Sequence, residues 1–347
     1  MSTTDSILVP QGAVVLDDEL DTSTRDAEDA AYVKLLQRLS HQSVVKHFDA
    51  YADVAWDAPE MRIDPSDPRW ELDADDTLGA TAWYRAQPQP VRAALGLHLF
   101  ATFMKIGLQF ESVLKRGLLE YAFNLPNGAP EFRYVYHEVI EEAQHSLMFQ
   151  EFVNRSGFDV RGLRKWEKTA SRMVVRLGRT FPELFFLFVL GGEDPIDHVQ
   201  RQMLKKRDDV QTLLLRKRYD VHPLLRRVSQ IHVTEEARHL SFARLYLRRN
   251  VPRLGVVKKT MLRVRTPLIL GQMSQMMMRP SPQIVRRYAI PETVLREAYD
   301  DNPKHRAQTT EAIAKVRKLC QELDLITPTT VKLWKAFHLW PADGTAA

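Results

Sequence analysis

The chain has 347 residues, 44% hydrophobic and 27% charged, a composition that excludes fibrous and wholly disordered proteins. Its single cysteine, Cys320, excludes an internal disulfide framework and any zinc or iron-sulfur site built from several thiolates. Any metal that this chain binds must therefore be held by His, Asp and Glu side chains.

The net charge of +5 is unevenly distributed. Residues 1 to 30 carry eight acids against one arginine, whereas residues 201 to 265 carry eighteen Lys or Arg against five acids. Such a basic stretch could attract nucleic acid or an anionic membrane surface. Its charges alternate with Leu, Val and Ile at helical spacing, however, and no aromatic stacking platform accompanies them. We interpret the stretch as solvated helix faces and expect no nucleic-acid partner.

The sequence also indicates where the protein resides. The N-terminus lacks the basic-then-apolar layout of a signal peptide. The longest apolar run, Phe181 to Gly192, is interrupted by Pro182 and Glu183 and is too short to span a bilayer. We expect a cytoplasmic protein without a membrane span.

In chain order, residues 1 to 28 are acidic and unpatterned, which predicts a disordered or loosely attached arm. One helix is expected at about Asp29 to Tyr51. A connector rich in Pro, Asp and Trp, from Trp56 to Trp83, is expected to pack as irregular structure over the helices that follow.

Four long helices dominate the prediction. They are expected at about Pro90 to Asn124, at Pro130 to Ser156, from Thr180 onward, and at His222 to Asn250. Thr180 and Glu183 have the spacing of a capping box, and Pro182 fits a first helical turn. Further helices are expected near 254–278, 291–300, 304–323 and 328–338, and no segment alternates like a strand. The expected architecture is all-α: a single helical domain over 29–347, with a bundle core at about 90–250 and C-terminal helices over 254–338.

An internal repeat contains the residues that indicate a metal site. Residues 138 to 145 read Glu-Val-Ile-Glu-Glu-Ala-Gln-His, residues 232 to 239 read His-Val-Thr-Glu-Glu-Ala-Arg-His, and the copies start 94 residues apart. Helix geometry places Glu142 beside His145, and Glu236 beside His239, one turn apart on one face. Surface charge patterning is the bland alternative. In di-iron bundles, however, two helices each supply Glu-x-x-His and two others supply one Glu apiece.

Two more carboxylates are needed for such a site. Glu111 lies at the end of an apolar stretch that begins at Phe103, and we prefer it to Glu120, which is too near the helix end. Glu193 follows a run of aromatic and aliphatic residues. Gly191, Gly192 and Pro195 would normally mark a turn and place Glu193 in a loop, and a kink or bulge would reconcile them with a ligand.

His232 lies on nearly the same helix stripe as Glu236 and His239, which predicts a third histidine ligand. Its counterpart in the repeat, Glu138, is either a supporting acid or a surface residue. Glu141 and Glu235 either accept hydrogen bonds from the ligand histidines of the facing helix or are exposed at the surface. Four carboxylates would neutralise two ferrous ions, and this donor set suits iron, with manganese as the alternative and zinc left open.

These residues resemble the p-aminobenzoate N-oxygenase family, di-iron enzymes of the ferritin-like superfamily. The resemblance covers roughly residues 45 to 280 and rests on the two Glu-x-x-His copies, the extra histidine and the two single glutamates. It implies a ferritin-like four-helix bundle with two iron ions as cofactor. The implied metal ligands are Glu111, Glu142, His145, Glu193, His232, Glu236 and His239.

The resemblance further implies an enzyme that uses dioxygen as co-substrate to N-oxygenate a small arylamine. It also implies an external electron donor, either a reductase or a ferredoxin, and a homodimer. Gly107, Met104 and Phe103 precede Glu111 on its helix, so no cation is available there to pair with an aromatic carboxylate, and the substrate stays open. The alternatives are a di-iron hydroxylase or desaturase acting on an apolar or acyl substrate, and a non-catalytic iron-binding protein.

Overall fold

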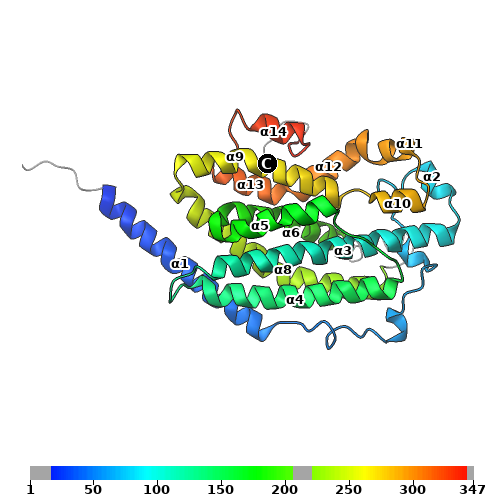
Figure 1. Ribbon diagram of the computed structural model, residues 1–347, viewed down its shortest axis with the longest axis horizontal. Coiled ribbons are helices and arrows are strands. Elements are labelled where there is room, and N and C mark those ends of the chain that lie inside the picture. Colours follow the sequence, from blue (N-terminus) through cyan, green and yellow to red (C-terminus); the bar gives the residue numbers. More distant parts are fainter. Residues whose placement is uncertain (1–16, 206–220, 342–347) are drawn as a thin grey trace, which may run out of the picture.

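The computed structural model describes residues 17–205 and 221–341, and every regular element within these ranges is a helix (Figure 1). The all-α prediction is therefore confirmed. Residues 1–16, which belong to the expected acidic arm, lie outside the described ranges.

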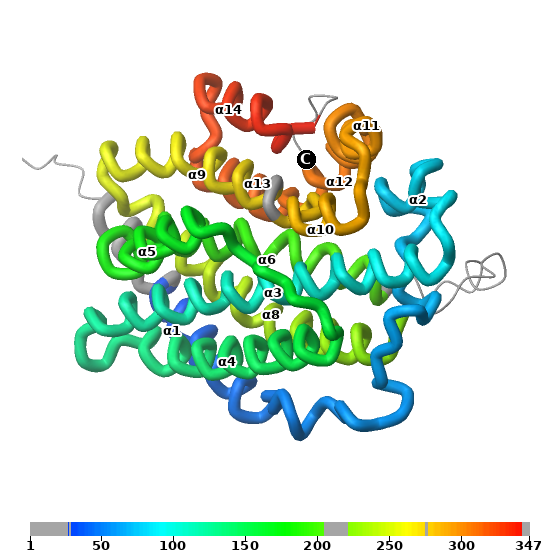
Figure 2. The backbone as a smooth tube through the Cα atoms, turned by 45° about the vertical axis from the view of Figure 1, so that its right-hand side comes forward, coloured from blue at the N-terminus to red at the C-terminus, as the bar shows by residue number. Residues whose placement is uncertain are grey.

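Four long helices form the bundle: α3 (Gln89–Ala122), α4 (Glu131–Ser156), α6 (Pro182–Lys205) and α8 (Pro223–Asn250). α3 packs mainly against α4, and α6 mainly against α8, while α4 also contacts α8 and α3 contacts α6. Figures 1 and 2 show the four helices running side by side along the long dimension of the molecule. Their bounds agree closely with the sequence prediction.

The remaining helices surround this bundle. α1 (Asp17–Val45) packs on α4 and α8. It begins at Asp17, so residues 17 to 28 of the expected disordered or loosely attached arm belong to this helix. The connector before α3 is irregular as predicted, with the short helices η1 (Pro59–Met61), η2 (Pro68–Trp70) and α2 (Ala82–Ala86).

The C-terminal part covers α6 with α9, α12 and α13. Its elements are η3 (Val251–Arg253), α9 (Val256–Met277), α10 (Pro282–Arg287), α11 (Glu292–Leu295), the π-helical turn η4 (Arg296–Asp300), α12 (Pro303–Ala312), α13 (Ala314–Glu322) and α14 (Val331–Ala336). All four predicted C-terminal helical regions are present, in shorter pieces.

Helix α5 (Lys165–Thr180) was not predicted. Thr180 is its last residue, and the Thr180 hydroxyl donates to the backbone oxygen of Arg176. The expected capping box between Thr180 and Glu183 is therefore wrong, although Pro182 does open α6. α5 carries five Lys or Arg and one acid, and because most of its surface is polar, the sequence pattern did not indicate the side of the helix that packs on α3.

The glycines before Glu193 reflect helix packing instead of a turn. α6 continues through Gly191, Gly192 and Pro195 without interruption. A Cβ at Gly192 would overlap the Phe110 ring of α3, and one at Gly191 would overlap the Leu270 side chain of α9. Only glycine allows this approach, so the alternative that placed Glu193 in a loop is wrong.

Two apolar clusters fill the bundle, one toward each end. One contains Phe110, Phe186 and Phe242, and the other contains Met148, Phe152 and Leu225. On α4 the first cluster ends near residue 139 and the second begins at 148; on α8 the order is reversed, with the boundary between 231 and 240. Between them, the inward face of each helix is polar and buried, and it carries the Glu and His residues of the repeat.

α3 is the one described helix that is long and apolar enough to cross a membrane by length and composition. Half of its apolar window is buried in the protein, and it carries Glu111 in the middle of the bundle. These features are those of a core helix.

Gly178→Ala is expected to lower the free energy of unfolding by about 1–3 kcal/mol, the range for overpacking a filled interior. The added Cβ would overlap the backbone oxygen of Gly117, which cannot rotate away. Gly255→Ala is the control, because nothing lies within 4 Å of a Cβ there. Urea denaturation measures both; equal stability of the two variants would contradict the close approach of α5 to α3.

Candidate metal centre

The four bundle helices bring the seven predicted residues into one buried volume. α3 contributes Glu111, α6 contributes Glu193, and the two copies of the repeat on α4 and α8 contribute the rest. All are at most 1% exposed: Glu111, Glu142, His145, Glu193, His232, Glu236 and His239. Three groups among them place their donor atoms within 4.8 Å of one another, close enough to hold a metal ion.

Glu236 lies at the middle of the cluster. One of its carboxylate oxygens is 3.0 Å from Nδ1 of His239, 3.6 Å from Nδ1 of His145 and 3.7 Å from Nε2 of His232. Glu142 lies between two of these rings, 3.0 Å from His239 and 3.7 Å from His145. One carboxylate from each copy of the repeat therefore lies beside more than one histidine ring.

Glu111 and Glu193 complete the cluster around His232. Nε2 of His232 is 3.6 Å from Glu111 and 4.0 Å from Glu193. The Ser146 hydroxyl donates to the other oxygen of Glu111 at 2.8 Å, and Lys115 donates to the Ser146 oxygen and, at 2.8 Å, to the backbone oxygen of Glu142. This short chain holds one Glu111 oxygen away from the cluster and leaves the other free.

Each histidine turns one ring nitrogen toward the cluster and the other toward a fixed acceptor. His145 of α4 is bonded through Nε2 to Glu235 of α8 at 2.9 Å, and His239 of α8 is bonded through Nε2 to Glu141 of α4 at 2.8 Å. The predicted exchange of hydrogen bonds between facing helices is thus confirmed. Such partners fix the tautomer and the ring orientation of a metal-binding histidine.

Arg238 neutralises both acceptors. Its guanidinium is 2.8 Å from Glu141 and 3.4 Å from Glu235, all three being nearly fully buried. Although burial opposes its charged form, His239 and Arg238 hold the pKa of Glu141 down at about 2. Glu141 therefore remains an anionic acceptor at neutral pH.

Several polar atoms of the cluster have no hydrogen-bond partner, and they are of the kinds that bind metal ions. Those with no hydrogen-bond partner in the described ranges are Glu111 Oε1, both oxygens of Glu142 and Glu193, Nδ1 of His145, Nε2 of His232 and Oε2 of Glu236. Burial and the neighbouring carboxylates raise the pKa of Glu193 well above its ordinary value. Buried polar atoms without partners are costly, and cations placed among these oxygens and imidazoles would satisfy them.

Glu138 is buried rather than at the surface, being 1% exposed. Burial raises its pKa to about 8, and neither of its oxygens has a hydrogen-bond partner among the described residues. The surface alternative for Glu138 is therefore wrong, and burial favours the neutral form of its carboxyl.

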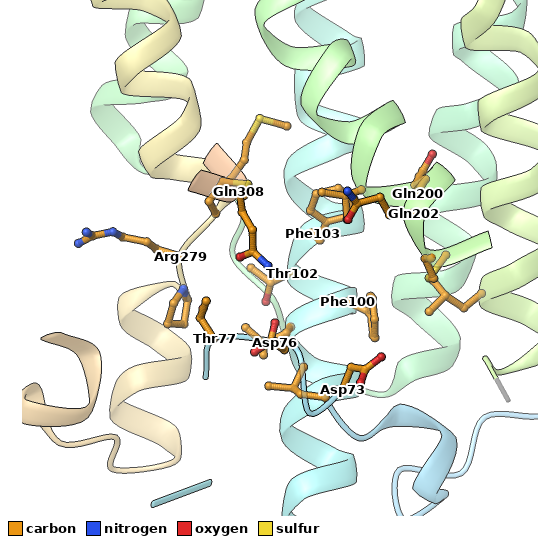
Figure 3. A pocket seen from close by; sticks show the side chains of 18 of the residues that line it. Asp73, Asp76, Thr77, Phe100, Thr102, Phe103, Gln200, Gln202, Arg279 and Gln308 are labelled. Atoms are coloured by element: carbon orange, nitrogen blue, oxygen red, sulfur yellow. The ribbon is translucent and has the colours of Figure 1, made fainter. Parts of the chain in front are cut away.

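A cavity of about 1060 Å³ lies beside the cluster. Its described lining comes from the connector before α3, from α3, α6 and α8, and from the segments around α9, α10 and α12 (Figure 3). Gln200 belongs to this lining, and its side-chain oxygen is 2.9 Å from Nδ1 of His232. The cavity thus reaches a residue that touches the cluster.

The sequence of the chain matches the model of a protein family, P-aminobenzoate N-oxygenase AurF, over residues 29–324. The chain belongs to the p-aminobenzoate N-oxygenase family. The predicted resemblance is confirmed, and the match is longer than the predicted region of about 45–280. The family is one of di-iron oxygenases, and the Glu and His clusters of this chain could bind metal.

Relatives within this family occur in mycobacteria. The chain is 38% identical over 309 residues to the uncharacterized protein Rv0885 of Mycobacterium tuberculosis and to the uncharacterized protein Mb0909 of Mycobacterium bovis. Each alignment covers 89% of this chain and 88% of the relative. No solved structure matches significantly.

Two residues of the site escaped the sequence prediction. Gln200 follows Glu193 by two helix turns, so the stripe of α6 that carries Glu193 could have pointed to it. Arg238 lies inside the repeat, and a positive charge in an otherwise buried motif was the available signal.

Glu141→Gln is expected to weaken metal binding by about tenfold, because the hydrogen bond that orients His239 loses its charge and its Arg238 partner. Glu151→Gln is the matched control on α4, since Glu151 pairs with Arg155. Competition with a chelator measures both affinities. Wild-type affinity in Glu141→Gln would contradict the orienting role.

Proposed function

We propose that this protein is a di-iron oxygenase that oxidises an amine-bearing organic substrate with dioxygen. The observation that carries the proposal is the set of orphaned carboxylate and imidazole atoms that face one another between four helices. Four carboxylates would balance two ferrous ions, and three neutral imidazoles would add affinity without charge.

In this proposal the seven residues would hold the two irons, with Glu142 and Glu236, which each lie near at least two histidine rings, at the middle of the set. When bound, the irons would supply the reduction and activation of dioxygen. The chain's own contribution is orientation and exclusion of water: Glu235, Glu141 and Gln200 hold the three rings, and the two apolar clusters close both ends.

The electron count requires a partner. Placing one oxygen atom of dioxygen in the product and reducing the other to water consumes two electrons and two protons beyond those of the substrate. We propose a reductase or a ferredoxin as the external donor.

For the reaction itself we propose N-oxygenation of an arylamine, which the family description supports. The second candidate is hydroxylation or desaturation of an apolar chain, which the apolar wall of the cavity favours through residues such as Phe103, Met104 and Ile196. A panel of aniline derivatives and acyl substrates, analysed for products by mass spectrometry, separates the two.

Glu111→Gln is expected to lower the iron content from two ions per chain toward one, and to reduce substrate oxidation by at least tenfold. A neutral amide at this position removes one charge and one strong iron ligand. Anaerobic iron loading followed by elemental analysis, and product formation after reduction and oxygen exposure, are the measurements.

Glu120→Gln is the matched control, because Glu120 lies on the same helix outside the cluster, 3.6 Å from Arg179. It is expected to keep two irons and full activity. Oxygen consumption that deposits iron as a mineral and yields no oxygenated product would support the storage alternative instead.

We also propose a homodimer formed through the outer face of α4. Phe132, Tyr136, Ile140 and Leu147 recur there at helical spacing and are 42% to 57% exposed. A second copy of the chain would bury this apolar stripe against its own, as the family resemblance implies.

Ile140→Glu is expected to convert the dimer to a monomer, since a charge would be buried in the centre of the interface. Val257→Glu on α9, where Val257 is 75% exposed, should leave the dimer intact. Sedimentation velocity distinguishes the states. A wild-type monomer, or a dimeric Ile140→Glu protein, would contradict this interface.

A further inference from the structure

Gln200 holds the third histidine differently from the way the other two are held. His145 and His239 are bonded to carboxylates, and both carboxylates are also held by Arg238. His232 is instead bonded to the amide oxygen of Gln200, at 2.9 Å. An amide differs from a carboxylate in carrying an N–H₂ group, which can donate hydrogen bonds of its own.

The amide nitrogen of Gln200 has no partner among the described residues, although the side chain is only 3% exposed. Two hydroxyls of the same cavity wall are also buried and unpartnered, Thr102 on α3 and Ser229 on α8. Figure 3 shows Gln200 and Thr102 around the cavity, with Phe100 and Phe103 on the α3 wall. Unpaired buried donors are costly, and a ligand that supplies an acceptor would pair them.

The orientation of the amide follows from His232. If Nε2 of His232 faces the metal, its proton resides on Nδ1, and the acceptor at 2.9 Å must be the oxygen of Gln200. The N–H₂ group then points away from the ring. This step rests on the proposed function.

We propose that Gln200 binds substrate: its N–H₂ group donates to an oxygen acceptor on a largely apolar molecule in the cavity, while its oxygen holds His232. The substrate class is an apolar molecule with a carbonyl, hydroxyl or carboxylate oxygen close to the group that is oxidised. A cavity of about 1060 Å³ is large enough for a drug-sized compound of this kind. The Gln200 side chain would then contact both the substrate and the histidine of the metal centre.

Two substitutions separate the two roles of Gln200. Gln200→Glu keeps an acceptor for the Nδ1–H of His232, as Glu141 and Glu235 provide for the other rings, but at neutral pH it has no donor for a ligand. Gln200→Leu removes both functions. Gln202→Glu is the matched control, because Gln202 also lines the cavity on α6 and is bonded to His198 at the surface.

The binding probes are butyrophenone and butylbenzene, which differ in a single acceptor oxygen. Isothermal titration calorimetry on metal-free protein gives the ratio of their dissociation constants, which cancels differences in apolar burial. The preference for the ketone is expected to fall about fivefold in Gln200→Glu and Gln200→Leu, the effect of one hydrogen bond. It should stay at the wild-type value in Gln202→Glu.

Ferrous iron affinity is measured in parallel by anaerobic chelator competition. Gln200→Glu should bind iron at least as tightly as the wild type, and Gln200→Leu about tenfold more weakly. An unchanged ketone preference in Gln200→Glu, or a Gln200→Leu protein that retains both properties, would overturn the proposal. Because the ketone ratio is measured without metal, a wild-type protein that fails to bind iron refutes the proposed function but leaves this test intact.

Discussion

Seven ionisable side chains share one buried volume, and their mutual compensation is the constraint on which the rest of the structure depends. Isolated buried carboxylates would be costly, and the four here have neither exposure nor enough hydrogen bonds to be stable alone. Part of this cost is met by the histidine rings and by the Ser146 hydroxyl, which donates to Glu111, while Arg238 pairs with Glu141 and Glu235 behind the cluster. The remaining unpaired atoms face one another, and cations placed among them would balance their charge. The same buried charges therefore constrain the fold and support the proposed chemistry.

The residues that accept hydrogen bonds from the three histidines fix the orientation of the rings in the cluster. Glu141 and Glu235 cross between α4 and α8, so each copy of the repeat orients the histidine of the other copy. The symmetry ends at the third histidine, where Gln200 replaces a carboxylate and the large cavity begins. The two ends of the bundle are closed by apolar clusters, and access is left to the side that Gln200 occupies. The one histidine whose ring is bonded to an amide instead of a carboxylate is therefore the one whose partner lines the cavity.

The sequence predicted the bundle and the cluster because both leave periodic signals: Glu-x-x-His twice at one spacing, and acids isolated within apolar helices at Glu111 and Glu193. The prediction failed where a short residue pattern is explained by contacts with a distant part of the chain. As a sequence pattern, Gly191 and Gly192 indicate a turn, whereas in the structure their lack of side chains leaves room for Phe110 and Leu270. Thr180 had the spacing of a cap but ends the unpredicted α5. The cavity that Gln200 lines is formed by six separate segments of the described chain, so no single stretch of the sequence reveals it.

Anomalous diffraction from crystals grown with ferrous iron under anaerobic conditions tests the central claim most directly, because it locates metal without assuming any reaction. The account predicts two iron peaks per chain, both in contact with Glu142 and Glu236 and each next to at least one of the three histidines. A single peak, peaks confined to the surface, or a cluster that stays without iron while its side chains keep their positions would contradict it.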